Sequence, residues 1–189
     1  MPAASTIDLT GHCLIAMPAM ADPNFARTVT YVCEHNSRGA LGLVINRPTE
    51  LTLQGLFEQV DIPLAAPALR ALPVHYGGPV QVDRGFVLHS PVGQWQSTLR
   101  VTEDIGLTTS RDILTALGQG EGPAKVLVTI GYAGWAPGQI EQEIRQNAWL
   151  TVQAEAPLLF EHPPAQRHAA ALRLLGIDLS RLSEQAGHA

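Results

Sequence analysis

The amino-acid sequence predicts an α+β protein with a mixed, mostly antiparallel sheet. Short strand-like segments that follow one another directly dominate the first half of the chain, and the predicted helices come at irregular intervals. A regular alternation of strand and helix, which a doubly wound nucleotide-binding fold requires, is missing. The 189 residues contain no long linker, so we expect a single domain over residues 1–189 with loose ends at residues 1–7 and 183–189.

Three apolar segments predict the first strands: residues 12–17, 28–35 and 40–45. In the second segment Val29, Tyr31 and Cys33 alternate with polar residues, so one face of this strand is expected to be buried. The third segment is apolar throughout and is expected to be covered on both faces. Because only residues 36–39 separate these two segments, they are expected to pair as a hairpin.

The middle of the chain alternates between short predicted elements and turns. Apolar residues three and four positions apart predict a helix over residues 52–60, and three prolines make residues 61–73 irregular. Two strands follow, at residues 85–90 and 98–101. Ser110 is expected to cap the start of a helix over residues 110–117, which Gly118 ends.

The last third of the chain holds a predicted central strand at residues 125–132, which is rich in β-branched residues. A helix follows over residues 139–146, with a Glu141–Arg145 pair on its outer face. One strand and one helix complete the chain, at residues 148–153 and 165–175. Gly176 is expected to end this last helix.

The composition is that of a globular protein, with 46% hydrophobic residues, 15% charged residues and a net charge of −5. The negative charge works against binding to nucleic acid or to anionic lipid. No apolar run approaches the ~20 residues of a membrane-spanning helix, and the first residues lack the basic and apolar regions of a secretory signal. Two cysteines, Cys13 and Cys33, fit a reducing compartment, so we expect a cytoplasmic protein without a membrane partner.

Several motifs follow one another along the chain: Phe-Ala-Arg-Thr-Val at residues 25–29, Glu-His-Asn at 34–36, Gly-Ala-Leu-Gly-Leu-Val-Ile-Asn-Arg-Pro at 39–48, Gly-Gly-Pro-Val at 77–80, Arg-Gly-Phe-Val-Leu-His-Ser at 84–90, Gly-Tyr-Ala-Gly-Trp at 131–135, Asn-Ala-Trp-Leu at 147–150 and Leu-Leu-Gly-Ile-Asp at 174–178. In this order they resemble the AlgH/YqgE family of uncharacterised bacterial proteins, over residues 8–182. The resemblance implies a bent sheet rolled into a partial barrel, with helices packed around it, in a bacterial cytosol. It also implies a regulatory role, because some members carry the label of a transcriptional regulator of polysaccharide production. It brings no catalytic residues.

A glycine-rich segment at residues 131–138 is expected to form a strand–loop–helix junction. Four residues in or beside it are candidate binding residues: Gly131, Gly134, Trp135 and Gln139. Backbone N–H groups here could bind an anion at the start of the helix, but Glu141 and Glu143 would repel one. A structural corner covered by Trp135, or a contact with a peptide or protein, are the other interpretations.

Asn46 and Arg47 end a predicted buried strand, where these residue types are recognition groups rather than core residues. Together with a second glycine corner at Gly77 and Gly78 they predict a polar pocket. This is the location that the sequence favours for a ligand or a partner. The alternative is structural, with Arg47 bound to Glu50 or capping the end of the sheet.

Cys33 and His35 lie two residues apart on a predicted strand, so they are expected to share a face, as two metal ligands would. No third ligand lies at a recognisable spacing, so we predict neither a metal nor a cofactor. A thiol enzyme needs a base closer to Cys33 than the ~7 Å of this spacing. His89 precedes a serine, but the glycines of a nucleophile elbow are absent. A buried cysteine and hydrogen-bonded strand-end histidines are the alternative interpretation.

The last predicted helix and the residues after it carry a basic flank, formed by Arg167, His168, Arg173 and Arg181. A DNA-binding helix would need more positive charge and a helix-turn-helix partner, so we interpret the flank as a solvated surface. The same helix has an apolar stripe, formed by Ala169, Leu172 and Leu175. This stripe faces the core or a second copy of the chain, which leaves a homo-oligomer open.

The sequence therefore predicts a non-catalytic binding or regulatory module that recognises a small polar ligand or a protein partner. The candidate binding residues are His35, Asn46, Arg47, Gly77, Gly78, His89, Gly131, Gly134, Trp135 and Gln139. The alternative is a hydrolase-like enzyme that depends on a thiol or a histidine, built around Cys33, His35 and His89. Direct binding to DNA has only the family label in its favour.

Overall fold

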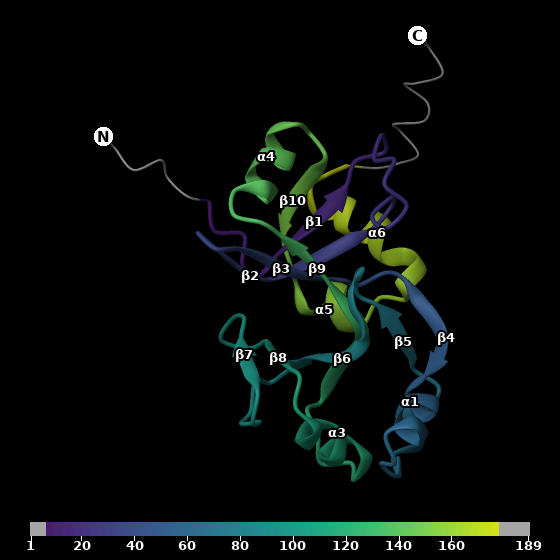
Figure 1. Ribbon diagram of the computed structural model, residues 1–189. Coiled ribbons are helices and arrows are strands. Elements are labelled where there is room, and N and C mark those ends of the chain that lie inside the picture. Colours follow the sequence, from purple (N-terminus) through teal and green to yellow (C-terminus); the bar gives the residue numbers. More distant parts are fainter. Residues whose placement is uncertain (1–6, 178–189) are drawn as a thin grey trace.

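The structure of the protein, a computed structural model, describes residues 7–177. Within them a curled, mostly antiparallel sheet forms a half-barrel with helices around it (Figure 1). The fold class predicted from the sequence is confirmed. The ends that we expected to be loose lie outside the described residues except for Ile7, which is exposed.

Ten strands and six helices form within residues 7–177. The strands are β1 (His12–Ala16), β2 (Val29–Asn36), β3 (Gly39–Val44), β4 (Pro48–Thr52), β5 (Pro73–Tyr76), β6 (Val80–Ser90), β7 (Thr98–Arg100), β8 (Gly106–Thr108), β9 (Lys125–Trp135) and β10 (Trp149–Gln153). The helices are α1 (Leu53–Gln59), α2 (Pro67–Arg70), α3 (Arg111–Gly118), α4 (Gln139–Arg145), α5 (Ala156–Phe160) and α6 (Pro164–Leu174). Nine predicted elements are confirmed with ends that agree closely: residues 12–17, 28–35, 40–45, 52–60, 98–101, 110–117, 139–146, 148–153 and 165–175.

Strand β9 lies at the centre of the sheet, as predicted. It pairs antiparallel with β3 and β6 and parallel with β5, and the strand order is β10-β1-β2-β3-β9-β6-β8-β7. Strand β4 joins the sheet through β5. In Figure 1, β9 runs from the lower half of the sheet into the upper half, so both halves share this strand. Strands β2 and β3 form the predicted hairpin, with Asn36 opposite Gly39.

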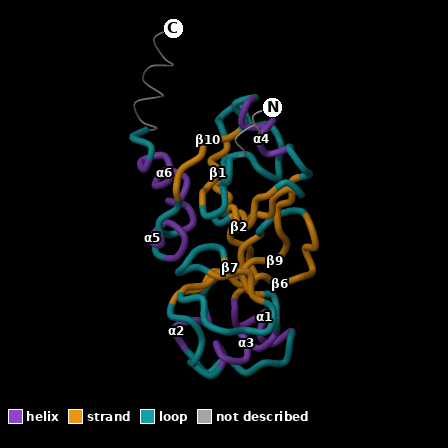
Figure 2. Tube along the Cα trace, turned by 90° about the vertical axis from the view of Figure 1, so that its left-hand side faces the viewer, coloured by secondary structure: helices purple, strands orange, loops and turns teal. Residues whose placement is uncertain are grey.

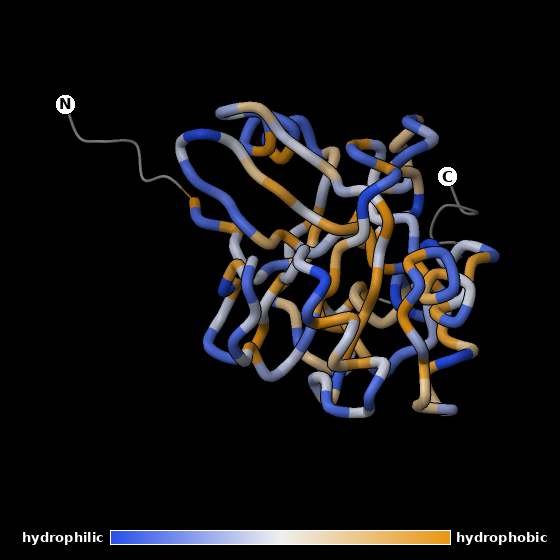
Figure 3. The backbone as a smooth tube through the Cα atoms, turned by 60° about the horizontal axis from the view of Figure 1, so that its bottom comes forward, coloured by the Kyte–Doolittle hydropathy of each residue, from blue (hydrophilic) through white to orange (hydrophobic). Residues whose placement is uncertain are grey.

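The helices lie on different sides of the sheet (Figure 2). Helices α5 and α6 lie along one flank, α4 lies at one end, and α1, α2 and α3 lie at the opposite end. Three buried clusters correspond to these groups. The first contains Tyr31 and Leu159, the second contains Ile140 of α4, and the third contains Phe57 of α1 and Ile113 of α3. Figure 3 shows hydrophobic stretches mainly in the interior of the fold and hydrophilic ones mainly at its outer bends.

Strand β2 differs from the prediction because both of its faces are buried. Thr30 and Val32 are as inaccessible as Tyr31. The second cluster, which includes Val32, covers the face that we expected to be polar. The register with β3 also shifts between Val32 and Glu34, so that Cys33 is an extra residue in a β-bulge.

The glycine-rich segment at residues 131–138 is mostly not the loop that the sequence predicted. Strand β9 continues through it to Trp135, and only a short turn separates the strand from α4. Gly131 has φ 74°, and a Cβ atom there would lie 2.3 Å from the oxygen of Gly78. Gly131 therefore lets this strand touch the corner at Gly77 and Gly78, and does not open a loop to a ligand.

Several short elements have no clear sequence signal, namely β4, β5, β8, α2 and α5. Helix α2 interrupts the region expected to be irregular, and β6 begins at Val80, before the predicted start at residue 85. Ser110 precedes α3 as predicted, but its hydroxyl donates to Asp112 instead of accepting a helix N–H group. Within residues 7–177, every helix is too short or too polar to cross a lipid bilayer.

Candidate functional site

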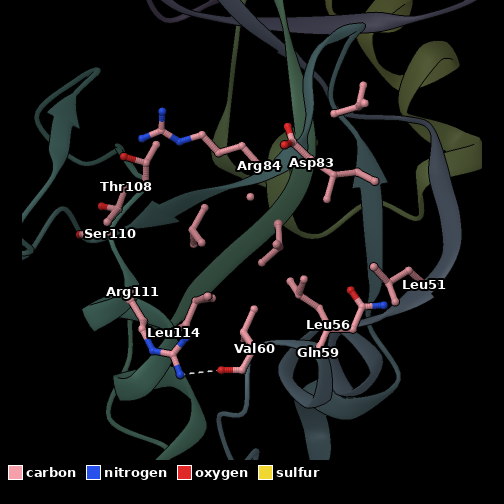
Figure 4. A pocket seen from close by; sticks show the side chains of 16 residues that line it. Leu51, Leu56, Gln59, Val60, Asp83, Arg84, Thr108, Ser110, Arg111 and Leu114 are labelled. Atoms are coloured by element: carbon pink, nitrogen blue, oxygen red, sulfur yellow. Dashed lines mark hydrogen bonds between the residues drawn. The ribbon is translucent and has the colours of Figure 1, made fainter.

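A cleft of about 450 Å³ lies between α1 and α3, over the face of the sheet that β6 and β9 form (Figure 4). In Figure 4 the two helices stand on opposite sides, with side chains of the strands between them. Its volume falls within the ~300–1,000 Å³ of typical small-ligand sites. The lining residues are Leu51, Leu56, Gln59, Val60, Val82, Asp83, Arg84, Gly85, Val87, Thr108, Thr109, Ser110, Arg111, Leu114, Val128 and Ile130.

The floor of the cleft is apolar because it is one face of two neighbouring strands. Val128 and Ile130 are two residues apart on β9, and Val87 of β6 lies opposite Val128. All three side chains therefore leave the same face of the sheet. Leu56 of α1 and Leu114 of α3 close the floor from the sides and remain partly exposed, as expected of an open apolar groove.

Polar contacts hold the two helical walls in place. Thr52 caps α1, since its Oγ1 atom accepts the N–H group of Gly55 at 3.2 Å. Arg111, the first residue of α3, donates from Nη2 to the carbonyl of Val60, which follows α1 (Figure 4). This hydrogen bond links the two walls of the cleft.

A bulge in β6 forms the rim of the cleft. Val80 pairs with Tyr132 and Gly85 pairs with Ile130, so residues 81–84 have no partner in β9, and β8 pairs only further along β6. The side chains of residues 81–84 are exposed. Gln81 has φ 48° and is not extended, so the open strand edge within this bulge is residues 82–84.

The rim carries a small excess of positive charge. Asp83 is the one acidic residue in the lining, and Arg84 and Arg111 are the basic ones. The Arg84 guanidinium lies 5.9 Å from the centroid of the Phe86 ring. The hydroxyl of Ser110 is already engaged, because it accepts the N–H group of Ser97 at 3.0 Å and donates to a carboxylate. The lining holds no His, Cys or Lys, so it offers apolar contact and charge without a nucleophile–base pair.

Asn46 and Arg47, the pair that the sequence favoured, bind backbone groups of this chain. Asn46 accepts from the N–H group of Val29 at 2.9 Å and donates to the carbonyl of Arg27 at 3.0 Å. Arg47 donates to two carbonyls of the loop before β2, at 2.7 and 2.9 Å, rather than to Glu50. Both side chains fasten this loop to the end of β3, and Asn46 also lines a cavity together with Arg27.

The four candidate glycines lie in backbone contacts. Gly77 and Gly78 meet β9 closely, since a Cβ atom on either would lie under 2.5 Å from backbone atoms of Gly131 or Tyr132. Gly134 lies within β9 and pairs with β3. Gly77 and Gly78 therefore join the connection between β5 and β6 to the central strand, Gly134 belongs to its pairing with β3, and none of them lines the cleft.

Trp135 and Gln139 also have structural partners. Trp135 is 6% exposed, and its ring lies 6.2 Å from that of Phe25 and 6.3 Å from that of Trp149. Gln139 accepts the N–H group of Ala136 at 2.9 Å through Oε1, which closes the turn before α4.

His89 is fully buried near the end of β6. Its Nδ1 atom donates to the carbonyl of Pro91 at 2.9 Å, because a carbonyl can only accept. Its Nε2 atom then accepts from the hydroxyl of Thr108 at 2.7 Å. Burial lowers the pKa of His89. Both ring nitrogens are used inside the protein.

His35 lies in the wall of a second cavity, of about 740 Å³, which also reaches Ile7, the first described residue. Its Nδ1 atom accepts the N–H group of Leu9 at 3.1 Å, so the proton of the neutral ring is on Nε2, which donates to Glu141 at 2.6 Å. Neither nitrogen is free to act as a base. Glu141 therefore binds His35. The prediction that it pairs with Arg145 on the outer face of the helix is wrong.

Cys33 and His35 do not share a face, contrary to the prediction. The extra residue at the bulge of β2 changes the alternation, so Cys33 joins the first cluster with Cys13 and Tyr31, whereas His35 lies beside the second. Both thiols are free and buried, and burial raises the pKa of each. Cys33, His35 and His89 are therefore not assembled into one group. Among the described residues no three His, Cys, Asp or Glu side chains gather as a metal site would require.

A thiol titration tests this placement. In the native protein we expect both cysteines to react with a disulfide reagent roughly 100-fold or more slowly than in the unfolded chain, because reaction requires a local opening that costs ~3 kcal/mol. The same titration of Cys33→Ala assigns the remaining signal to Cys13. A fast reaction of one native thiol would contradict the burial of these side chains.

The sequence predicted that Arg167 lies on a solvated basic face, but its side chain is buried. It is 5% exposed, and its guanidinium donates to the carbonyl of Ile45 and lies 3.3 Å from Nε2 of His75. His75 is 4% exposed, and burial together with the Arg167 charge lowers its pKa to about 4. The contacts of Arg167 with Ile45 and His75 connect α6 to the ends of β3 and β5.

The other residues of the predicted basic flank and of the predicted apolar stripe on α6 differ in their exposure. His168 is half-buried and lines a cavity, Arg173 is exposed, and Arg181 lies outside the described residues. In the predicted apolar stripe Leu172 is buried, whereas Leu175 is 38% exposed.

No motif in the sequence marks the cleft residues as functional. The pattern of the predicted strand at residues 125–132 does place Val128 and Ile130 on one face. The exposure of Val80 and Val82, at 36% and 50%, could be suspected from their alternation with polar residues. The open edge itself depends on pairing between distant strands, which no local pattern shows.

Comparison with known proteins gives matches over nearly the whole chain. Residues 13–180 match a family model described as AlgH-like. A UPF0301 protein of Nitrosospira multiformis is 59% identical over 184 residues, which cover 97% of this chain and 99% of that protein. Another, of Azoarcus sp., is 58% identical over 182 residues, covering 96% and 97%.

Two solved structures are similar. The solution structure of the AlgH protein from Pseudomonas aeruginosa has a TM-score of 0.80 and 50% identity, and the match covers 100% of both chains. The crystal structure of a protein from Corynebacterium diphtheriae has a TM-score of 0.70 at 19% identity, over 90% of this chain and 89% of that chain. The second likeness shows the fold alone.

Proposed function

This chain belongs to the AlgH-like family, as the sequence motifs indicated, and we propose that it is a non-catalytic recognition module for a partner protein. Its cleft between α1 and α3 would bind an extended polypeptide segment of that partner. The observation that carries the proposal is the open edge of β6 at residues 82–84, beside an apolar floor.

An extended segment suits the cleft because two features lie side by side. Residues 82–84 have no partner in β9, so an added strand would pair with their backbone groups, which is how many domains bind peptides. Alternate side chains of that strand would then face the floor at Val128 and Ile130. The two rim arginines, Arg84 and Arg111, favour a segment that also carries an acidic residue.

The side-chain chemistry supports recognition rather than catalysis. The cleft holds no histidine, cysteine or lysine. Elsewhere in the described chain, the ring nitrogens of His35 and His89 are engaged, and the thiols of Cys13 and Cys33 are buried. The candidates of the enzymatic alternative therefore lack a free base beside an accessible nucleophile.

A binding assay with a defined peptide tests the proposal. The probe is a labelled hexapeptide of alternating valine and threonine with an aspartate at its end, followed by fluorescence polarisation. We expect Val82→Glu to weaken binding about tenfold or more, since it removes the contact of a valine worth ~1.5 kcal/mol and adds a negative charge. Val80→Glu is the matched control, because Val80 lies on the same exposed strand but outside the cleft lining.

Two outcomes would overturn the cleft assignment. One is equal weakening by Val82→Glu and Val80→Glu. The other is equal affinity for a peptide of the same composition whose valines are consecutive, because such a peptide cannot present alternate side chains to the floor.

We further propose that any role in regulation acts through this protein contact, in the cytoplasm, and not through DNA. The net charge of −5 and the burial of Arg167 support this, since they leave little positive surface for phosphates. In a polarisation assay with a random DNA duplex at ~0.15 M salt, we expect no binding. Saturable binding that weakens as salt is added would contradict the proposal.

A further inference from the structure

A third cavity, of about 510 Å³, lies between the start of α6 and the ends of β1 and β3; we call it the α6 cavity. Its lining consists of Ala16, Pro18, Arg27, Asn46, Pro164, Ala165 and His168. The lining includes two basic side chains and no carboxylate. This contrasts with the net charge of −5 of the whole chain.

Arg27 is held in the wall of this cavity by its backbone. It has φ 60°, in the left-handed region, and its carbonyl accepts from Asn46 at 3.0 Å. Within residues 7–177 its guanidinium has no carboxylate partner, since the two contacts of a basic side chain with a carboxylate there are His35–Glu141 and Lys125–Glu161. The charge of Arg27 is therefore available to an external anion.

His168 adds a second polar group to the α6 cavity. Its Nε2 atom is buried and has no hydrogen-bond partner among the described residues. Burial lowers the pKa of His168, a hydrogen bond to the Ala16 backbone opposes this, and the Arg27 charge adds to the lowering. Two basic groups thus act on each other without an acidic group between them.

The surroundings reinforce the positive potential. Helix α6 starts at Pro164, directly after Pro163, and neither proline has an N–H group, while the N–H of Gln166 donates to the carbonyl of Pro163. The N–H of Ala165 is therefore the helix donor beside the cavity, and no acidic residue lies in the first turn. Arg47 donates to the carbonyl of the residue before Arg27. Arg167, next to His168, donates to the carbonyl of the residue before Asn46. The neighbouring arginines are therefore bound to neutral carbonyls, which leave their charge uncompensated.

We propose that the α6 cavity binds a tetrahedral oxyanion, a phosphate or sulfate group that is free or part of a small molecule. Arg27 would pair with its charge and the Ala165 N–H group at the start of α6 would donate to it. Nε2 of His168 would donate to it as well, because a bound anion raises the pKa of the ring and lets it take up a second proton. Donors from three directions suit a tetrahedral group better than a planar carboxylate. The cavity is separate from the cleft between α1 and α3, so this inference does not depend on the proposed function.

A sulfate titration at constant ionic strength, followed by NMR signals of the His168 ring and the Ala165 amide, tests the site. Sulfate is the probe because it does not titrate near neutral pH. We expect saturable shifts in the wild-type protein and at least about tenfold weaker binding in Arg27→Gln, as for the loss of a charged hydrogen bond. Arg38→Gln removes the same charge from the β2–β3 turn and should bind like the wild type.

Two further measurements complete the test of this anion site. His168→Gln should also weaken sulfate binding, and acetate should bind more weakly than sulfate. Unsaturable shifts in the wild type, or equal affinities of wild type and Arg27→Gln, would overturn the site. Equal binding of acetate would overturn its assignment to a tetrahedral group.

Discussion

Replacing Gly131 by alanine is expected to lower the free energy of unfolding by about 3–5 kcal/mol. Gly131 has φ 74°, where a side chain costs ~1–2 kcal/mol. In addition, the new Cβ atom would lie 2.3 Å from the backbone oxygen of Gly78 and 3.2 Å from that of Val80. Backbone oxygens cannot rotate away as a flexible side chain can, so β9 or the corner would have to shift.

Gly138→Ala is the matched control for this prediction. Gly138 has φ 76°, nearly the same as Gly131, but a Cβ atom there would meet nothing within 4 Å. Its substitution should therefore cost only the ~1–2 kcal/mol of the backbone conformation. Urea unfolding of both variants measures the difference. Equal losses in the two variants would show that the contact between β9 and Gly78 is easily relieved.

The second large effect is the loss of stability in weak acid through His75. Burial and the Arg167 charge lower its pKa in the folded protein from 6.5 to about 4. Below pH 6.5 the unfolded chain binds a proton that the folded protein does not, so the free energy of unfolding falls as the pH falls from 6.5 towards 4. The loss from this group is about 3 kcal/mol, a large part of a typical total of ~5–15 kcal/mol.

His75→Gln separates this contribution from those of other groups. Glutamine keeps an acceptor for the Arg167 guanidinium but cannot bind a proton in this range. Urea unfolding at pH 7 and at pH 4.5 should show a smaller acid loss in the variant, by roughly 2–3 kcal/mol. The same acid loss in both proteins would mean that His75 is not held neutral by its surroundings.

The sequence predicts well those elements whose formation depends on residues close together in the chain. The β2–β3 hairpin follows from a short turn between two apolar segments, and α1 follows from apolar spacing after Thr52. The course of β9 could not be predicted in the same way. Glycines at residues 131 and 134 usually indicate a loop, and only the distant corner at Gly78 explains why the strand needs Gly131.

The functional candidates were harder to predict for the same reason. Arg167 follows a helical pattern that fits a solvated face, yet the carbonyl of Ile45 and the ring of His75 lie opposite it. The bulge at Cys33 reverses which residues of β2 share a face, and alternation alone cannot reveal one extra residue. The cleft needs α1 and α3 to meet over one sheet, although more than fifty residues separate their starts.

The sharing of β9 by both halves of the sheet has a practical consequence. Because β9 pairs with β3, β5 and β6, neither half can melt without breaking pairs that the other half needs. Heating should therefore produce one cooperative transition. A compound bound only by the folded protein, at either end of the molecule, would then raise the same melting temperature. A simple thermal-shift screen of compound libraries would report on occupants of every cavity at once.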